Sequence, residues 1–172
     1  MSFFIISLTL IHTPMKKILY LHGLDAKPKP EKVSILEKAG IVIAPKLNYR
    51  AFLGDITLFN ELSDAVTIEK ITHIVGSSFG GYMGFYLSEI CKIPGVLFNP
   101  ALSYKSLDVP VVKSYSDTKK TIILGIYDDV IDPKMTKKFI GENQFQNIEI
   151  VELPFGHQVS EEYFEIALKY IN

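Results

Sequence analysis

Apolar and polar positions follow two different periods along this chain. Six short apolar runs, rich in β-branched residues, predict strands near residues 17–21, 41–45, 72–76, 94–98, 120–125 and 148–153. Most segments between them show the spacing of a helix that buries one face. Strands that alternate with helices indicate an α/β protein with a mainly parallel sheet and helices on both faces.

Two helical patterns stand out. The segment near residues 52–68 has apolar side chains at helical spacing, namely Phe52, Ile56, Phe59, Leu62 and Val66. The last helix places Phe164, Ala167 or Leu168, and Ile171 on one face. We interpret the stripe of the first segment as core-facing rather than as a cofactor site.

Length and composition indicate one compact domain at residues 15–172. A chain of 172 residues with 48% apolar content forms a single core and leaves no room for a second domain or a large lid. Residues 1–14 are a separate segment whose apolar run is too short to span a bilayer. Because Met15-Lys16-Lys17 resembles a natural start, we interpret this segment as an over-extended reading frame or an extra edge strand.

Net charge and cysteine content indicate which classes of binding partner and which cellular compartment to expect. The formal net charge is −1 and the lysines and arginines form no cluster, which argues against a nucleic-acid or anionic-membrane partner. Cys91 is the one cysteine, so no intrachain disulfide forms. We therefore expect a cytoplasmic protein that acts on a small molecule.

The most informative motif is Gly76-Ser77-Ser78-Phe79-Gly80, which lies between a predicted strand and a predicted helix from Gly81 to about Cys91. It matches the G-x-S-x-G nucleophile elbow, in which a sharp turn exposes the central serine, here Ser78. Gly76 and Gly80 permit the close approach of strand and helix. An ordinary turn or a phosphate-binding turn is the alternative, although no G-K-[ST] follows.

A serine nucleophile needs an acid and then a histidine downstream. Asp128 follows the strand at 120–125 and is our predicted acid, with Asp129 as its rival. Asp132-Pro133 is better explained as a helix N-cap followed by proline at the first helical position.

His157 follows the last strand and precedes a helix start at Ser160, and it is the one histidine after the acid. We predict that it is the general base.

The tetrahedral intermediate of acyl transfer also needs two backbone N–H donors. One is expected at Phe79, the residue after the nucleophile, and the other at Leu24 in the loop after the first strand. Gly23 permits the tight turn there. We interpret His22 as an orienting or packing residue, because it belongs to this loop and precedes the serine.

With these residues in place, the chain from Met15 onward resembles the α/β-hydrolase superfamily and, within it, the small bacterial YqiA-like esterases. Four blocks carry the resemblance in the correct order: 20–23, 75–82, 99–101 and 128–132. The resemblance implies the strand order 2-1-3-4-5-6, without the superfamily's first two antiparallel strands. The oxyanion loop and the elbow then flank one crevice.

The chain departs from the family pattern in two places. The family's oxyanion loop tends to continue as Phe-Asn-Ser-Ser-Pro, whereas residues 24–28 here read Leu-Asp-Ala-Lys-Pro. The family's Gly-Gly-x-His approach to the base is replaced by residues 154–157, Pro-Phe-Gly-His. The first departure affects the shape of the acyl pocket more than the reaction type, and the second leaves the histidine in place.

These patterns predict a serine hydrolase that cleaves a carboxyl ester or thioester through Ser78, His157 and Asp128, without metal or cofactor. The alternative is a non-catalytic or single-turnover binding protein on the same scaffold. Aromatic residues near the predicted loops suggest an apolar acyl or aryl group. The expected pocket residues are Tyr49, Arg50, Tyr82 and Phe155, with Phe52, Leu102 and Tyr104 as further candidates.

Overall fold

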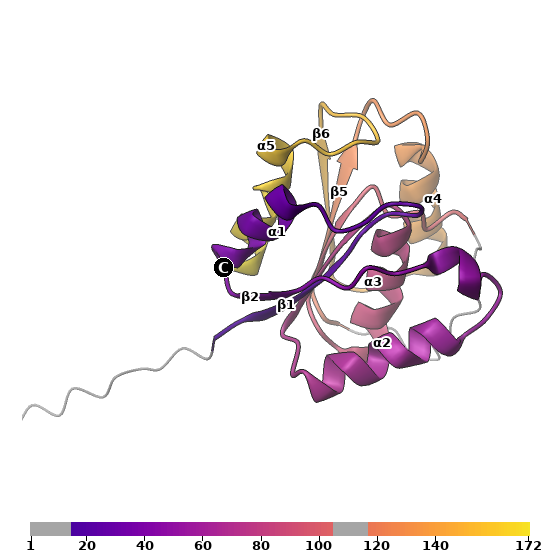
Figure 1. The fold of residues 1–172 in the computed structure, drawn as a ribbon. Helices are drawn as coiled ribbons and strands as arrows, with labels where there is room; N and C mark the ends of the chain where they lie inside the picture. The colour runs from indigo at the N-terminus through magenta and orange to yellow at the C-terminus, as the bar shows by residue number, and fades with distance from the viewer. Residues whose placement is uncertain (1–14, 105–116) are drawn as a thin grey trace, which may run out of the picture.

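A computed structural model of the protein describes residues 15–104 and 117–172 and shows one six-stranded parallel sheet (Figure 1). The strand order is β2-β1-β3-β4-β5-β6, as the resemblance implied. The strands are β1 (Lys17–Leu21), β2 (Ile41–Ile43), β3 (His73–Ser77), β4 (Gly95–Phe98), β5 (Lys120–Gly125) and β6 (Ile148–Leu153). The two interpretations of residues 1–14 lie outside the described residues.

The strands occupy the predicted segments, and β2 is the one that is clearly shorter than predicted. It ends at Ile43, where residues 41–45 were expected. Pro45 follows closely and has no N–H to donate to a neighbouring strand. Within the described residues β2 is also an edge strand that pairs with β1 alone, so a short strand leaves fewer unpaired backbone groups at that edge.

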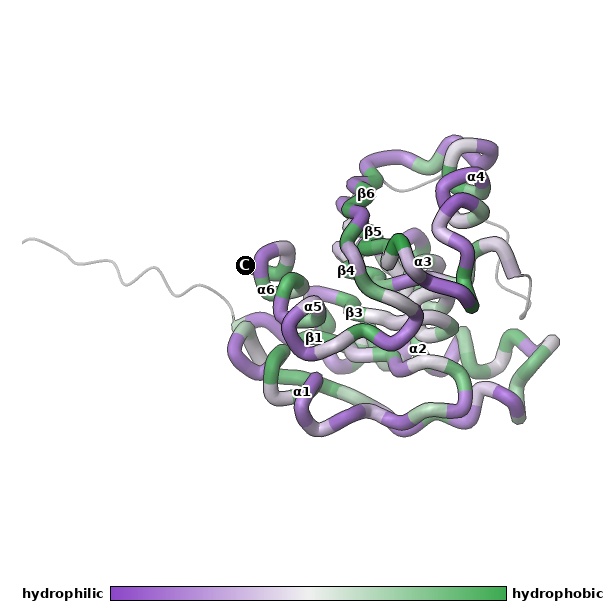
Figure 2. The backbone as a smooth tube through the Cα atoms, turned by 90° about the horizontal axis from the view of Figure 1, so that it is seen from above, coloured by the Kyte–Doolittle hydropathy of each residue, from purple (hydrophilic) through white to green (hydrophobic). Residues whose placement is uncertain are grey.

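Helices cover both faces of the sheet (Figure 1). One face carries α1 (Pro30–Glu37), α5 (Glu161–Phe164) and α6 (Ala167–Ile171), and the other carries the 3₁₀ helix η1 (Tyr49–Phe52), α2 (Thr57–Ile68), α3 (Phe79–Cys91) and α4 (Pro133–Asn143). Each layer of helices packs against the sheet through its own cluster of buried apolar side chains. Figure 2, seen from above, shows hydrophobic segments along the central strands and hydrophilic loops outside them.

The predicted helix at 52–68 is divided in two by the backbone at Gly54. Gly54 has φ 78°, in the left-handed region, so η1 ends before it and α2 begins at Thr57. The carboxylate of Asp55 accepts hydrogen bonds from the N–H and the hydroxyl of Thr57, at 2.8 and 2.7 Å. Phe52 therefore lies in η1 rather than on the apolar face of α2.

The last helix is likewise two short helices, α5 and α6, instead of the single helix predicted. Phe164, Ala167 and Ile171 are buried on the same side of the chain, so the apolar stripe survives the break between them. Ser160 stands at the N-cap of α5, as predicted, but its hydroxyl makes no capping hydrogen bond.

Parallel pairing brings the carboxyl ends of all six strands to one edge of the sheet. The loops after β1, β3, β5 and β6 therefore meet there, although their residues are far apart in sequence. Between β1 and β3 the order of the strands reverses, and the helices that follow these strands cover opposite faces (Figure 1). A crevice is expected at this position, and the predicted site residues lie around it.

None of the helices in the described part of the chain is both long enough and apolar enough to cross a membrane.

Glycines make the contact between the elbow and its neighbours possible. A Cβ atom at Gly76 would lie 2.4 Å from the carbonyl oxygen of Gly80, and a Cβ atom at Gly80 would lie 2.2 Å from the carbonyl oxygen of Leu21. Both obstacles are backbone atoms, which cannot move aside without shifting β1 or α3. The helix also begins at Phe79, two residues earlier than predicted, so the turn is tighter than the sequence suggested.

We predict that Gly80→Ala lowers the free energy of unfolding by about 3 kcal/mol or more, because the added methyl group overlaps the end of β1. The matched control is Gly141→Ala in α4, where nothing lies within 4 Å of the added Cβ. There alanine should raise the free energy of unfolding by about 0.5–1 kcal/mol, since it loses less backbone entropy on folding. Urea unfolding followed by circular dichroism measures both, and equal effects would refute the steric argument.

Candidate active site

Ser78 lies at the turn between β3 and α3 in a backbone conformation that side chains rarely adopt. Its φ is 54° and its ψ is −118°. Three backbone hydrogen bonds hold this conformation: the N–H of Ser78 donates to the carbonyl of Phe98, and its carbonyl accepts from the N–H groups of Tyr82 and Ala101. The surrounding structure therefore holds the strained serine in place, as a nucleophile elbow requires.

His157 and Asp128 are hydrogen-bonded across the loops that follow β6 and β5. Nδ1 of His157 lies 2.9 Å from Oδ2 and 3.1 Å from Oδ1 of Asp128. A carboxylate only accepts, so the ring donates from Nδ1 and presents Nε2 on its opposite side. The Asp128 side chain is fully buried, whereas 19% of the His157 side chain remains exposed.

Local backbone geometry fixes the Asp128 carboxylate. Its Oδ1 accepts from the N–H groups of Val130 and Ile131, both at 2.8 Å. Asp129, the rival candidate, is exposed to solvent. Asp132 caps α4 by accepting from the N–H of Lys134 at 2.8 Å, which confirms the predicted capping role.

Asn99 links the acid loop to the histidine loop. Its side-chain oxygen accepts from the N–H of Gly125 at 2.7 Å, and its side-chain nitrogen donates to the carbonyl of Gly156 at 3.2 Å. A third connection runs from the N–H of Tyr127 to the carbonyl of Phe155 at 3.1 Å. The loops that carry Asp128 and His157 are thus fixed to each other and to the end of β4.

A pocket of about 90 Å³ joins Ser78 and His157. Among the described residues, no hydrogen bond connects the Ser78 hydroxyl directly to the His157 ring. Such bonds are often long in unbound enzymes and shorten in the complex with substrate. The residues around the pocket are Tyr20, His22, Gly23, Leu24, Ala26, Lys27, Lys29, Lys32, Ser77, Ser78, His157, Gln158 and Val159.

The loop after β1 passes directly beside Ser78. A Cβ atom at Gly23 would lie 3.5 Å from the Cβ atom of Ser78. Leu24 follows in the same loop and borders the pocket. In the described parts of the chain, neither the N–H of Leu24 nor that of Phe79 donates to another protein group. Both predicted oxyanion donors are therefore unpaired near the serine.

His22 is buried and holds the peptide that carries the Leu24 N–H. Its Nδ1 lies 2.8 Å from the carbonyl oxygen of Gly23, and its Nε2 accepts from the N–H of Leu47 at 2.9 Å. Since the carbonyl needs a donor and the amide needs an acceptor, the proton is on Nδ1. Both nitrogens are occupied, which agrees with an orienting residue rather than a second base.

The four expected pocket residues do not line the pocket at Ser78. Tyr49 is buried and donates from its hydroxyl to the carbonyl of His22, and Tyr82 is buried against Phe79. Arg50 is exposed and pairs with Asp25, and this pairing lowers the pKa of Asp25 and raises that of Arg50.

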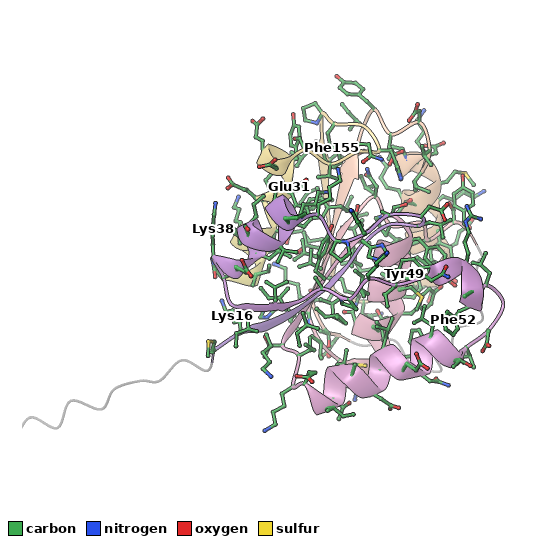
Figure 3. All side chains as sticks on the ribbon, in the orientation of Figure 1. Lys16, Glu31, Lys38, Tyr49, Phe52 and Phe155 are labelled. Carbon is green, nitrogen blue, oxygen red and sulfur yellow. The ribbon has the colours of Figure 1, made fainter. Side chains whose placement is uncertain are left out.

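Phe155, the fourth expected residue, follows β6 and packs against Tyr163, and Figure 3 shows it near the top of the molecule, above Tyr49. None of the four borders the pocket at Ser78.

Three residues of this region have roles that sequence reasoning missed. Asn99 was part of the family resemblance, but its links between loops depend on which strands are neighbours. Lys32 and Tyr20 border the pocket, although both belong to regular elements, α1 and β1. A buried lysine on a helix looks like a solvated charge in sequence, so no local signal identifies it.

Solved structures with the same architecture include several hydrolases. The match to a Pyrococcus furiosus esterase has 17% identity and a TM-score of 0.72, and covers 91% of this chain and 81% of that one. A monoacylglycerol lipase from Paleococcus ferrophilus matches with 14% identity and a TM-score of 0.70, over 90% and 93% of the two chains.

A Xanthomonas campestris protein assigned to the hydrolases of the alpha/beta superfamily matches with 15% identity and a TM-score of 0.68. The match covers 90% of this chain and 98% of that one. At these identities the matches establish the fold alone.

Residues 17–129 match the uncharacterised protein family UPF0227, the YqiA-like family. This match covers well over half of the chain, including the β1 loop, the elbow and Asp128, and ends before His157. Together with the strand order and the solved structures, it confirms the resemblance found in the sequence. The protein belongs to the UPF0227 family and has the α/β-hydrolase fold.

Proposed function

We propose that the protein is a serine hydrolase that cleaves a carboxyl ester or thioester. The observation that carries this proposal is the hydrogen bond of 2.9 Å between His157 Nδ1 and the buried carboxylate of Asp128. The same histidine borders one pocket together with Ser78. A carboxylate on Nδ1 keeps the proton off Nε2, which is then the basic atom on the pocket side. Hydrolase and esterase relatives of the same fold support the proposal by analogy.

The reaction follows from these positions in two steps. The Ser78 oxygen bonds to the carbonyl carbon while its proton moves to His157 Nε2, and the negative oxygen accepts hydrogen bonds from the Leu24 and Phe79 amides. The bond to the alcohol or thiol then breaks, and the leaving group takes the proton from His157. Water repeats the sequence on the acyl-enzyme, yielding the free acid and restoring the Ser78 hydroxyl.

A non-catalytic or single-turnover binding protein is the second candidate. The missing direct hydrogen bond between Ser78 and His157 favours it, because a serine without its base reacts slowly. A fluorophosphonate probe and a short-chain nitrophenyl ester separate the two. A catalyst turns the ester over repeatedly and carries the label on Ser78, whereas a binding protein shows no label, or label without turnover.

Ser78→Ala is expected to lower turnover of the nitrophenyl ester by ~10⁴–10⁶, since the nucleophile is lost. Ser77→Ala is the matched control, because Ser77 is adjacent and borders the same pocket. It should retain at least about a tenth of the turnover. Equal losses in the two variants would show that the nucleophile is not correctly assigned to Ser78. No loss in either variant would refute the proposed hydrolase function.

Asp128→Asn is expected to lower turnover by about 10³–10⁴, because the amide no longer stabilises the charged ring and favours the wrong tautomer. Asp129→Asn provides the comparison, since this neighbouring carboxylate is exposed and, among the described residues, forms no hydrogen bond or ion pair with His157. Steady-state kinetics on both variants decides between them. If the second variant is the inactive one, the acid has been misassigned although the reaction class stands.

Asn99→Ala should lower the free energy of unfolding by about 2–4 kcal/mol, because it leaves the buried N–H of Gly125 and the carbonyl of Gly156 without partners. Turnover should fall as well, since the loops of Asp128 and His157 lose their link. Asn143→Ala is the control: its side chain caps the end of α4 by donating to the Phe139 carbonyl at 2.8 Å. Urea unfolding compares the two variants, and a similar small cost would show that Asn99 does not hold the loops.

A further inference from the structure

Lys32 is a buried lysine at the pocket of Ser78. It belongs to the first turn of α1, only 7% of it is exposed, and it borders the pocket together with Lys27 and Lys29. Among the described residues, its ammonium forms no ion pair and no hydrogen bond. The ammonium lies instead over the face of the Phe164 ring, whose centre is 4.8 Å from Nζ, in a cation–π contact.

A lysine that is buried to this extent, with its Nζ open to the pocket, costs stability. Burial, together with the charge of Lys29, lowers the pKa of Lys32 to about 8. The contact with Phe164 offsets part of the cost, but an aromatic face does not fill the three N–H donors of the ammonium. The arrangement becomes favourable when an anion enters the pocket and accepts from Nζ.

Tyr20 adds a second unfilled donor beside Lys32. It lies on β1, is 2% exposed, and borders the same pocket. Its ring packs edge-on against Phe164 with a centroid separation of 5.5 Å, so Tyr20 and Lys32 both lie against one aromatic ring. The Tyr20 hydroxyl has no hydrogen-bond partner in the described parts of the chain. Burial raises its pKa, so it stays protonated and available as a donor.

The lining of the pocket is otherwise free of negative charge. Its described residues include three lysines but no aspartate or glutamate. We propose that Lys32 and Tyr20 form an anion subsite beside Ser78, which selects esters or thioesters that carry a carboxylate or phosphate close to the scissile bond. This inference rests on the proposed hydrolase function. Lys27 and Lys29, which are exposed, raise the positive potential at the entrance.

Two pairs of substrates test the selection and locate the anion. For an anion on the acyl side, mono-para-nitrophenyl adipate is compared with para-nitrophenyl adipamate, in which a neutral amide replaces the terminal carboxylate. For an anion on the leaving group, meta-carboxyphenyl butyrate is compared with meta-carbamoylphenyl butyrate. Near neutral pH, the wild-type protein should show a higher kcat/KM for the anionic member of one pair.

Lys32→Met keeps most of the apolar stem and removes the charge. It should lower the ratio of kcat/KM between the anionic and the neutral ester by about 10- to 100-fold, the size expected for a buried charge-assisted hydrogen bond. Tyr20→Phe should lower the same ratio by about 3- to 10-fold, because one neutral donor is lost. Lys38→Met is the matched control: Lys38 lies at the opposite end of α1 and pairs with Glu165 at 2.6 Å (Figure 3). It should leave the ratio at the wild-type value.

Stability supplies an independent readout. Lys32 is charged in the unfolded chain up to its usual pKa of 10.5, but in the folded protein only up to about 8. The unfolded state therefore binds more protons between these values, and this residue makes stability rise with pH in that window. Lys32→Met should unfold at a higher temperature than the wild type at neutral pH, and the difference should shrink as the pH rises through 8 to 10. The neighbouring groups Lys27, Lys29, Glu31, Tyr20 and His157 are present in both proteins, so the difference reports Lys32 together with its electrostatic coupling to Lys29 and Glu31.

The result that would overturn the subsite is a ratio of kcat/KM that is unchanged in Lys32→Met, or a wild-type protein that prefers neither anionic ester. A destabilised Lys32→Met protein would also count against it, since the lysine would then serve packing against Phe164. If Ser78→Ala leaves turnover intact, the proposed hydrolase fails separately.

Calorimetric titration of adipate into the Ser78→Ala protein tests the anion site without turnover. Adipate binding that is present in the Ser78→Ala protein and lost in the double variant Ser78→Ala, Lys32→Met supports the subsite. Binding that is absent, or that is equal in both proteins, refutes it.

Discussion

The approach of the elbow to the end of β1 is the constraint on which the whole site depends. The backbone of Gly80 touches the carbonyl of Leu21 so closely that a single Cβ atom would lie 2.2 Å from that oxygen. This contact places the first turn of α3 and the loop at Gly23 on either side of Ser78. The nucleophile and both candidate oxyanion donors then take fixed relative positions from rigid elements rather than from flexible side chains.

Buried polar contacts extend this rigidity to the other two members of the site. Asn99 connects the loops after β4, β5 and β6, and two backbone amides aim the carboxylate of Asp128 at His157. These groups are satisfied by one another, so burial costs little. Lys32 differs from these groups, because its charge forms no ion pair or hydrogen bond within the described chain, although the Glu31 carboxylate is near enough to raise its pKa slightly against the effect of burial. A protein that keeps such a charge beside its candidate nucleophile gives up stability for a site prepared to receive an anion.

Much of the architecture could be read from local patterns. The strand and helix periods predicted an α/β fold, and the resemblance added the order of its strands, both of which the structure and the family match confirm. Ser78, Asp128 and His157 could be named because each follows an apolar strand, and parallel strands bring their carboxyl ends to one edge. Their catalytic roles remain predictions. The predicted helix boundaries were wrong where one residue changes the local backbone, as Gly54 does when it separates η1 from α2.

The sequence by itself determined which segments form strands and which side chains follow them, because hydrophobic period and turn chemistry act over a few residues. Only the tertiary structure decided what meets across the sheet. Lys120 and Glu89 form a fully buried ion pair at 2.7 Å although they are 31 positions apart in the sequence. Lys32 borders a pocket that the residues next to it in sequence do not predict. Such contacts depend on strand order, register and helix placement, which long-range packing sets.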